Sequence, residues 1–132
     1  MFSLLVAMAL ATATETAAGA GGADLNAATE WINLIDSRRW DDSWNAAGTI
    51  FKSRMPKAKW IATIRPVREP LGVVSSRSVT NVTQATSLPG VPDGQYEVVQ
   101  YETTFARKKD ATETVVLSHE ESGWKVDGYF IR

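Results

Sequence analysis

The last third of the chain, Gln95 to Arg132, constrains the fold most, because its apolar and polar residues alternate over three short runs. A period of two is the pattern of strands that bury one face. Turn residues separate the runs at Lys108-Lys109-Asp110 and at Glu120-Glu121-Ser122-Gly123. We therefore expect three antiparallel strands joined by two tight turns, with the rest of the chain built to cover the resulting sheet.

The parity of the final strand predicts which of its side chains reach the core. Glycine within an inward-facing set either admits a bulky neighbour or opens the floor of a pocket. The expected inward set is Trp124, Val126, Gly128 and Phe130, and the expected outward set is Lys125, Asp127 and Tyr129.

The region before this sheet carries a helical period instead. We expect three helices, and then a half-exposed strand rich in Ser, Thr and Val that ends before a turn-rich segment. Segregated helices and strands predict an α+β fold, with about three N-terminal helices packed on one face of a curved four-stranded antiparallel sheet. Such a sheet often leaves a cavity at its open end. The helices are expected to begin near Asp24 or Asn26, after Trp40 at Asp41-Asp42, and at Pro56, with the third ending or kinking between Arg65 and Glu69.

Composition excludes several classes of function. The 132 residues are enough for one domain with one core, and the formal net charge is -1. A nearly neutral chain argues against a partner recognised by charge, and against nucleic acid in particular. Its one basic run, Arg107-Lys108-Lys109, falls at a predicted turn and is interpreted as solvated. With no cysteine and one histidine, we expect no disulfide, no metal site and no cofactor.

The first 23 residues resemble an export signal followed by a flexible spacer. An apolar run from Phe2 to Ala11 is too short to span a bilayer, and small residues suited to cleavage follow it. No Lys or Arg precedes the run, which departs from the usual signal, and a buried N-terminal helix is the alternative. We expect residues 24–132 to form a single domain that is periplasmic or secreted, with no stable membrane span after cleavage.

Two charged residues stand on strand faces that also carry core valines. Arg77 shares a face with Val79, and Glu113 shares one with Val115. A buried charge is costly unless it is paired, so we expect an Arg77–Glu113 ion pair across the sheet, unless both residues lie at hydrated strand ends.

Three other residues are candidates for acid–base catalysis. Asp36, Tyr101 and His119 would have to converge near the cavity mouth, where an acid or base beside a tyrosine hydroxyl suits isomerase chemistry. The competing interpretation is a solvated His119 on the rim and an Asp36 bonded to a neighbouring arginine. Among the five tryptophans, we expect only Trp40, at a helix junction, to be partly exposed and available to a pocket.

A pattern of motifs runs through nearly the whole of the mature chain and resembles a known family. It includes Trp31, Trp40, Trp44, Pro70-Leu71-Gly72, Leu88-Pro89-Gly90, Pro92-Asp93-Gly94 and Gly123-Trp124-Lys125-Val126 before Gly128-Tyr129-Phe130-Ile131. With these residues the chain resembles the bacterial domain-of-unknown-function family number 4019, apart from Trp40, where relatives carry a Gly-x-Tyr-like turn. The resemblance implies small exported proteins with a cone-shaped nuclear-transport-factor-like or cystatin-like layout, which hosts many functions and selects none.

Three functional hypotheses remain open at this point. The first is a non-catalytic module that binds a small ligand or an envelope protein. The second is a small cone-fold enzyme of isomerase or hydrolase type, working through Asp36, Tyr101 and His119. The third is a cystatin-like inhibitor that uses the loop from Leu88 to Gly94 as a wedge. A homodimer formed through the outer face of the sheet is compatible with each of them.

Overall fold

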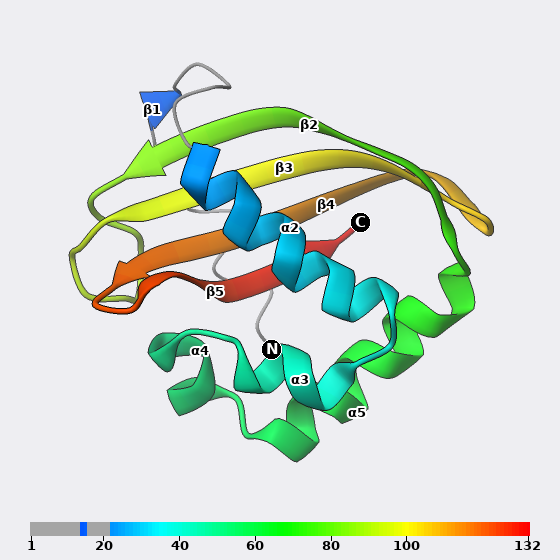
Figure 1. Ribbon diagram of the computed structural model, residues 1–132, viewed down its shortest axis with the longest axis horizontal. Coiled ribbons are helices and arrows are strands. Elements are labelled where there is room, and N and C mark those ends of the chain that lie inside the picture. The colour runs from blue at the N-terminus through cyan, green and yellow to red at the C-terminus, as the bar shows by residue number, and fades with distance from the viewer. Residues whose placement is uncertain (1–13, 16–21) are drawn as a thin grey trace.

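The computed structural model describes residues 14–15 and 22–132, and in them four helices lie on one side of an antiparallel sheet (Figure 1). The α+β prediction is confirmed. The elements are, in chain order, β1 (Thr14–Glu15), α2 (Gly22–Asp36), α3 (Trp40–Asn45), α4 (Thr49–Arg54), α5 (Lys57–Arg68), the 3-10 helix η2 (Glu69–Leu71), β2 (Val74–Ala85), β3 (Tyr96–Phe105), β4 (Lys108–Glu120) and β5 (Gly123–Ile131).

Where the sequence predicted one second helix, the structure has two short helices, α3 and α4, because the helix breaks at Gly48. Gly48 is extended, with φ -76° and ψ 168°, and its N–H donates to the Val126 carbonyl of β5 at 2.7 Å. A β-carbon at Gly48 would stand 2.2 Å from Oδ1 of Asp127. Glycine therefore allows the helical layer to meet the edge of the sheet closely at this point.

The sheet follows chain order, β1-β2-β3-β4-β5, and each pair of neighbours is antiparallel. The four long strands β2 to β5 make up nearly all of it, and Figure 1 shows them curving around α2. The two residues of β1 pair with Thr83 and Gln84 of β2. These two residues fall in the segment interpreted as signal and spacer, most of which lies outside the described residues.

The main core fills the space between the helices and the inner face of the sheet. Trp31 of α2 packs on Tyr129 of β5 with ring centroids 5.4 Å apart, and Trp60 of α5 meets Phe51 edge to face at 4.9 Å. A smaller apolar cluster lies on the outer face, built from Leu88, Tyr96, Val98 and Val116 with Val91 and Phe130 packed against it. Buried aromatic area of this kind dominates the stability of a small domain.

A β-bulge in β5 corrects the predicted parity of that strand. Leu117 pairs with Val126 and Val116 pairs with Gly128, so one residue, Asp127, is extra. A bulge of one residue reverses the alternation beyond it. Trp124 and Val126 face the main core as expected, but the inward residues beyond the bulge are Tyr129 and Ile131. The prediction was wrong for Tyr129, Gly128 and Phe130.

Gly128 is therefore not the floor of a pocket between helices and sheet. It lies on the outer face, where the ring of Phe130 passes 3.1 Å from the position that a β-carbon would take. Trp40 also differs from the prediction: it is buried, with 5% of its surface exposed. Trp44, expected in the core, is the partly buried tryptophan of α3 instead.

Candidate functional site

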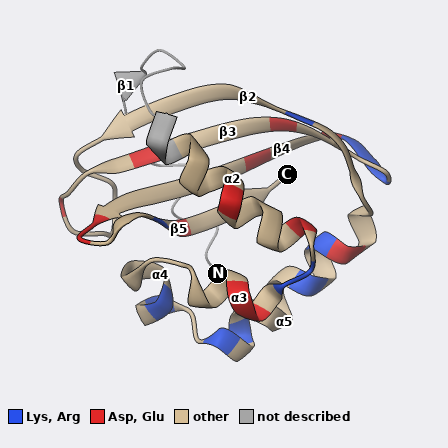
Figure 2. Cartoon of the chain, viewed as in Figure 1, with Lys and Arg blue, Asp and Glu red and all other residues tan. Residues whose placement is uncertain are grey.

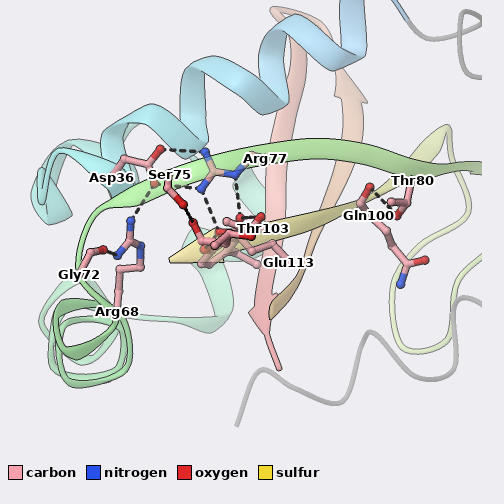
Figure 3. Close-up of polar contacts among 11 residues, drawn as sticks. Asp36, Arg68, Gly72, Ser75, Arg77, Thr80, Gln100, Thr103 and Glu113 are labelled. Atoms are coloured by element: carbon pink, nitrogen blue, oxygen red, sulfur yellow. Dashed lines mark hydrogen bonds and ion pairs between the residues drawn. The ribbon is translucent and has the colours of Figure 1, made fainter. Parts of the chain in front are cut away.

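One arginine joins the first helix to the inner face of the sheet. Arg77 of β2 donates to both carboxylate oxygens of Asp36, the last residue of α2, at 2.8 and 3.0 Å. Its Nε donates to Glu113 of β4 at 2.7 Å, so the expected Arg77–Glu113 ion pair is formed. Figure 3 shows the guanidinium between the two acids. Such fork geometry is the strongest form of arginine–carboxylate contact.

A second arginine reaches the same acid from the helical layer. Arg68, at the end of α5, donates to Asp36 at 3.0 Å and to the Gly72 carbonyl at 2.8 Å (Figure 3). Its guanidinium carbon lies 4.4 Å from the centroid of the Phe105 ring. Asp36 thus ties α2 to both α5 and β2, and Arg68 is buried although it is charged.

Glu113 is fully buried and accepts hydrogen bonds from three residues. Besides Arg77, the hydroxyls of Thr103 on β3 and Tyr129 on β5 donate to its two oxygens. Burial, and then the neighbouring Glu113 charge, raise the pKa of Tyr129 well above its usual value, so this hydroxyl stays protonated and donates. We refer to Asp36, Arg68, Arg77, Thr103, Glu113 and Tyr129 as the buried ion network.

The charges in the buried ion network balance, with two arginines against two carboxylates. Burial alone would raise the pKa of Asp36, but hydrogen bonds and attraction from Arg77 and then Arg68 outweigh it, and the pKa is lowered. Burial would lower the pKa of Arg77, and its bonds to Asp36 and Glu113 raise it instead. Both groups remain charged at ordinary pH. A general acid or base needs a pKa near the working pH, and the shifts of Asp36 and Arg77 move away from it.

The three residues proposed for acid–base catalysis are not brought together. Tyr101 is buried opposite Glu113 in the β3–β4 register. Burial, opposed by Arg77, reinforced by Glu113 and opposed again by the Thr29 side chain, raises the pKa of Tyr101 to about 12. His119 is exposed at the other end of β4, edge-on to Trp124 at 5.1 Å. Six residues of strand separate it from Glu113, or about 20 Å.

Two acids that sequence reasoning did not single out hold α4 against the sheet. Oδ1 of Asp127 accepts from the Phe51 N–H at 3.3 Å, and Glu120 accepts from the N–H of Thr49 at 2.8 Å. Ser118 also donates to Asp127. Burial is the main cause of the raised pKa of Asp127. The bulge turns Asp127 toward α4, and no pattern in the sequence marks that bulge.

Charge is distributed very unevenly between the layers, although the whole chain is nearly neutral. Residues 37–69 hold eight Lys and Arg against three Asp and Glu, whereas the remaining residues hold six against twelve. Figure 2 shows basic residues on α4 and α5 below the sheet, with acidic residues on α3 beside them. We define the basic helical surface as the seven cations of this segment outside the buried ion network, namely Arg38, Arg39, Lys52, Arg54, Lys57, Lys59 and Arg65.

Two of these cations converge on one aromatic ring. The ammonium groups of Lys52 on α4 and Lys57 on α5 each lie 5.4 Å from the centroid of Trp44. The indole N–H of Trp44 donates to the Met55 carbonyl, which fixes the ring in the turn between α4 and α5. Each cation–π contact at a partly exposed site contributes about 0.5–1 kcal/mol. Two positive charges and an apolar ring are therefore held at one place on the basic helical surface.

The described residues contain no helix that is both long and apolar enough to cross a membrane. No curated protein matches this chain. A model of a protein family of unknown function, DUF4019, matches residues 27–129, which spans most of the chain from α2 into β5. The chain therefore belongs to the DUF4019 family.

Proposed function

We propose that this protein is a non-catalytic binding module that docks on an acidic partner protein through its basic helical surface. The observation that carries the proposal is the segregation of charge, with the seven cations of the basic helical surface against three acids in residues 37–69, and with an excess of six negative charges outside that segment. Complementary charge between two surfaces steers association and fixes orientation. Net charge was the ground for expecting no partner recognised by charge, but it does not describe a chain whose two signs lie on different segments.

Trp44 with Lys52 and Lys57 is the proposed centre of the contact. An Asp or Glu side chain of the partner meets two ammonium groups there, and its aliphatic part packs against the indole ring. Tryptophan and arginine are enriched at the energetic centres of interfaces, and charged rims mainly set the association rate. The outer cations, such as Arg65 and Lys59, belong to that rim.

The buried ion network supports a non-catalytic role. Its acids are committed to arginines and hydroxyls, Asp36 to Arg68 and Arg77, and Glu113 to Arg77 and the hydroxyls of Thr103 and Tyr129. The inhibitor hypothesis receives less support from the loop between Leu88 and Gly94. Leu88 and Val91 pack against the outer-face cluster, so this loop does not project an apolar wedge.

Export is part of the proposal and rests on the sequence of residues 1–23. An exported module would meet its acidic partner in the bacterial envelope or outside the cell. Fractionation of cells that carry the full-length chain tests this part, and full recovery of the protein from the cytoplasm would contradict it.

Fluorescence anisotropy with labelled poly-L-glutamate tests the contact surface. We expect the double variant Lys52→Glu/Lys57→Glu to bind this probe at least about thirtyfold more weakly, since it loses two close charge pairs of about 1 kcal/mol each in water and puts like charges in their place. The matched control is Lys108→Glu/Lys109→Glu at the start of β4, since the turn expected at Lys108-Lys109-Asp110 lies at Ala106 and Arg107 instead. It makes the same change in net charge and is expected to bind within twofold of the wild type. Binding should also weaken with added salt.

Three outcomes would refute the proposal. The wild type could fail to bind poly-L-glutamate at low salt. The two double variants could lose affinity equally, which would show a response to net charge alone. The protein could instead bind vesicles that contain phosphatidylglycerol and ignore poly-L-glutamate, which would assign the surface to lipid.

A further inference from the structure

The edge of the sheet that lies farthest from α4 is formed by β2, and only one side of this strand is fully paired. β2 pairs with β3 from Val74 to Ala85, with register shifts between Val74 and Ser76 and between Val79 and Asn81. On its other side the described residues contribute only β1, at Thr83 and Gln84. From Val74 to Thr80 no described strand lies against that side. A row of unpaired N–H and C=O groups of this length is a template for another strand.

This edge lacks the charges that usually protect such strands. The one charged residue of β2, Arg77, turns to the inner face and is occupied by Asp36 and Glu113. Figure 2 shows the β2 ribbon without any other charged position. Its exposed side chains are uncharged, and they are Ser75, Ser76, Ser78, Val79 and Thr80, preceded by Val73 at 72% exposure.

We propose that a second copy of this chain occupies the edge, with the two β2 strands paired antiparallel along residues 74–80. Pairing residues 74–80 with the same residues of a second copy sets the two Arg77 residues opposite each other. Each Arg77 is already paired with Asp36 and Glu113 of its own copy, and the other side chains along the edge are uncharged. β1 already adds to β2 antiparallel, so the same edge accepts an added strand in that direction. The dimer has two-fold symmetry and joins the four long strands of each copy into one continuous sheet.

The dimer leaves the basic helical surface free. Figure 1 shows β2 on the opposite side of the sheet from α4, which meets β5 through Gly48. Both basic surfaces of the dimer remain exposed. A contact made by one edge strand is smaller than a standard interface, so we expect a dissociation constant between roughly 10 µM and 1 mM.

Cysteine cross-linking tests the geometry cleanly, because the chain has no cysteine of its own. In this register Ser76 of one copy lies opposite Ser78 of the other, so an equal mixture of the single variants Ser76→Cys and Ser78→Cys places two thiols across the seam. We expect this mixture to form a disulfide-linked dimer under mild oxidation. Thr80→Cys alone should not cross-link, because its two copies stand about 20 Å apart. Ser122→Cys, on the exposed β4–β5 turn, is the matched control and should stay monomeric. Equal cross-linking of the control and the edge variants would overturn the proposal.

Sedimentation equilibrium up to about 1 mM tests the association itself. We expect a concentration-dependent dimer in the wild type and in Ser122→Lys, and at least tenfold weaker association in Ser78→Lys, which places a charge on each edge. A wild type that stays monomeric at about 1 mM overturns the proposal. A dimer that Ser78→Lys leaves intact also overturns it, because the contact then lies elsewhere, such as on the outer face of the sheet.

Discussion

Removal of Arg77 should destabilise the fold more than removal of any exposed cation. In Arg77→Met, Glu113 keeps the hydroxyls of Thr103 and Tyr129 but loses its counter-ion while remaining fully buried. Asp36 keeps Arg68. Breaking one side of a buried ion pair costs about 3–5 kcal/mol. For a domain of this size that corresponds to a fall in melting temperature of roughly 15–25 °C.

Urea unfolding followed by tryptophan fluorescence measures this loss, with Arg65→Met as the control. Arg65 is more than half exposed and lies 3.9 Å from Glu69, so its removal should cost less than about 0.5 kcal/mol. Adding Glu113→Gln to Arg77→Met should recover about 1–2 kcal/mol, because the unpaired buried charge is then gone. If Arg77→Met lowers the free energy of unfolding by less than about 1 kcal/mol, the ion pair does not behave as a buried pair and the reasoning is refuted.

The remaining predictions concern two acids. The pKa of Asp36 is lowered in the folded state, so its contribution to stability is present above the unfolded value of 3.8 and is lost as pH falls through the folded value. Asp36→Asn should therefore lose less stability than the wild type when urea unfolding is compared at pH 5 and at pH 2, and an equal loss would contradict this. Glu97 is fully buried, with Gln84 donating to one oxygen and no partner for the other in the described part of the chain. Glu97→Gln should raise stability at pH 7 by about 1–2 kcal/mol, and a lower melting temperature would contradict this.

Local patterns predicted the layout and the ion pair for clear physical reasons. Alternation marks the strands because each buries one face, and the same parity placed Arg77 and Glu113 beside core valines, where an unpaired charge is too costly. The third partner, Asp36, could not be predicted in this way. Its contact depends on how the end of α2 is set over the sheet, which periodicity does not encode.

Single-residue irregularities account for most of the errors. The bulge at Asp127 reverses the last strand, and with it the positions of Gly128 and Tyr129. The extended backbone at Gly48 splits one expected helix into two. Glycine at position 48 permits a break or a close approach, but whether the helix breaks there depends on contacts with β5 that are far away in sequence. The bulge at Asp127 has no comparable local signal.

Net charge did not predict the basic helical surface, because it is a sum over the whole chain. Its cations are spread from Arg38 to Arg65 and form no run, whereas the run at Arg107-Lys108-Lys109 drew attention to a turn. Folding gathers the scattered cations into one layer and leaves most acids on the sheet and α2. A count of charge per expected layer would have shown the asymmetry.

Amide chemical-shift mapping tests the central claim most directly. A ¹⁵N-labelled sample titrated with poly-L-glutamate should show its largest shifts in residues 38–65 and at the indole N–H of Trp44, with the free edge of β2 and the start of β4 at Lys108 and Lys109 unaffected. Shifts concentrated at the start of β4, or spread evenly over every exposed cation, would contradict a binding role for the basic helical surface.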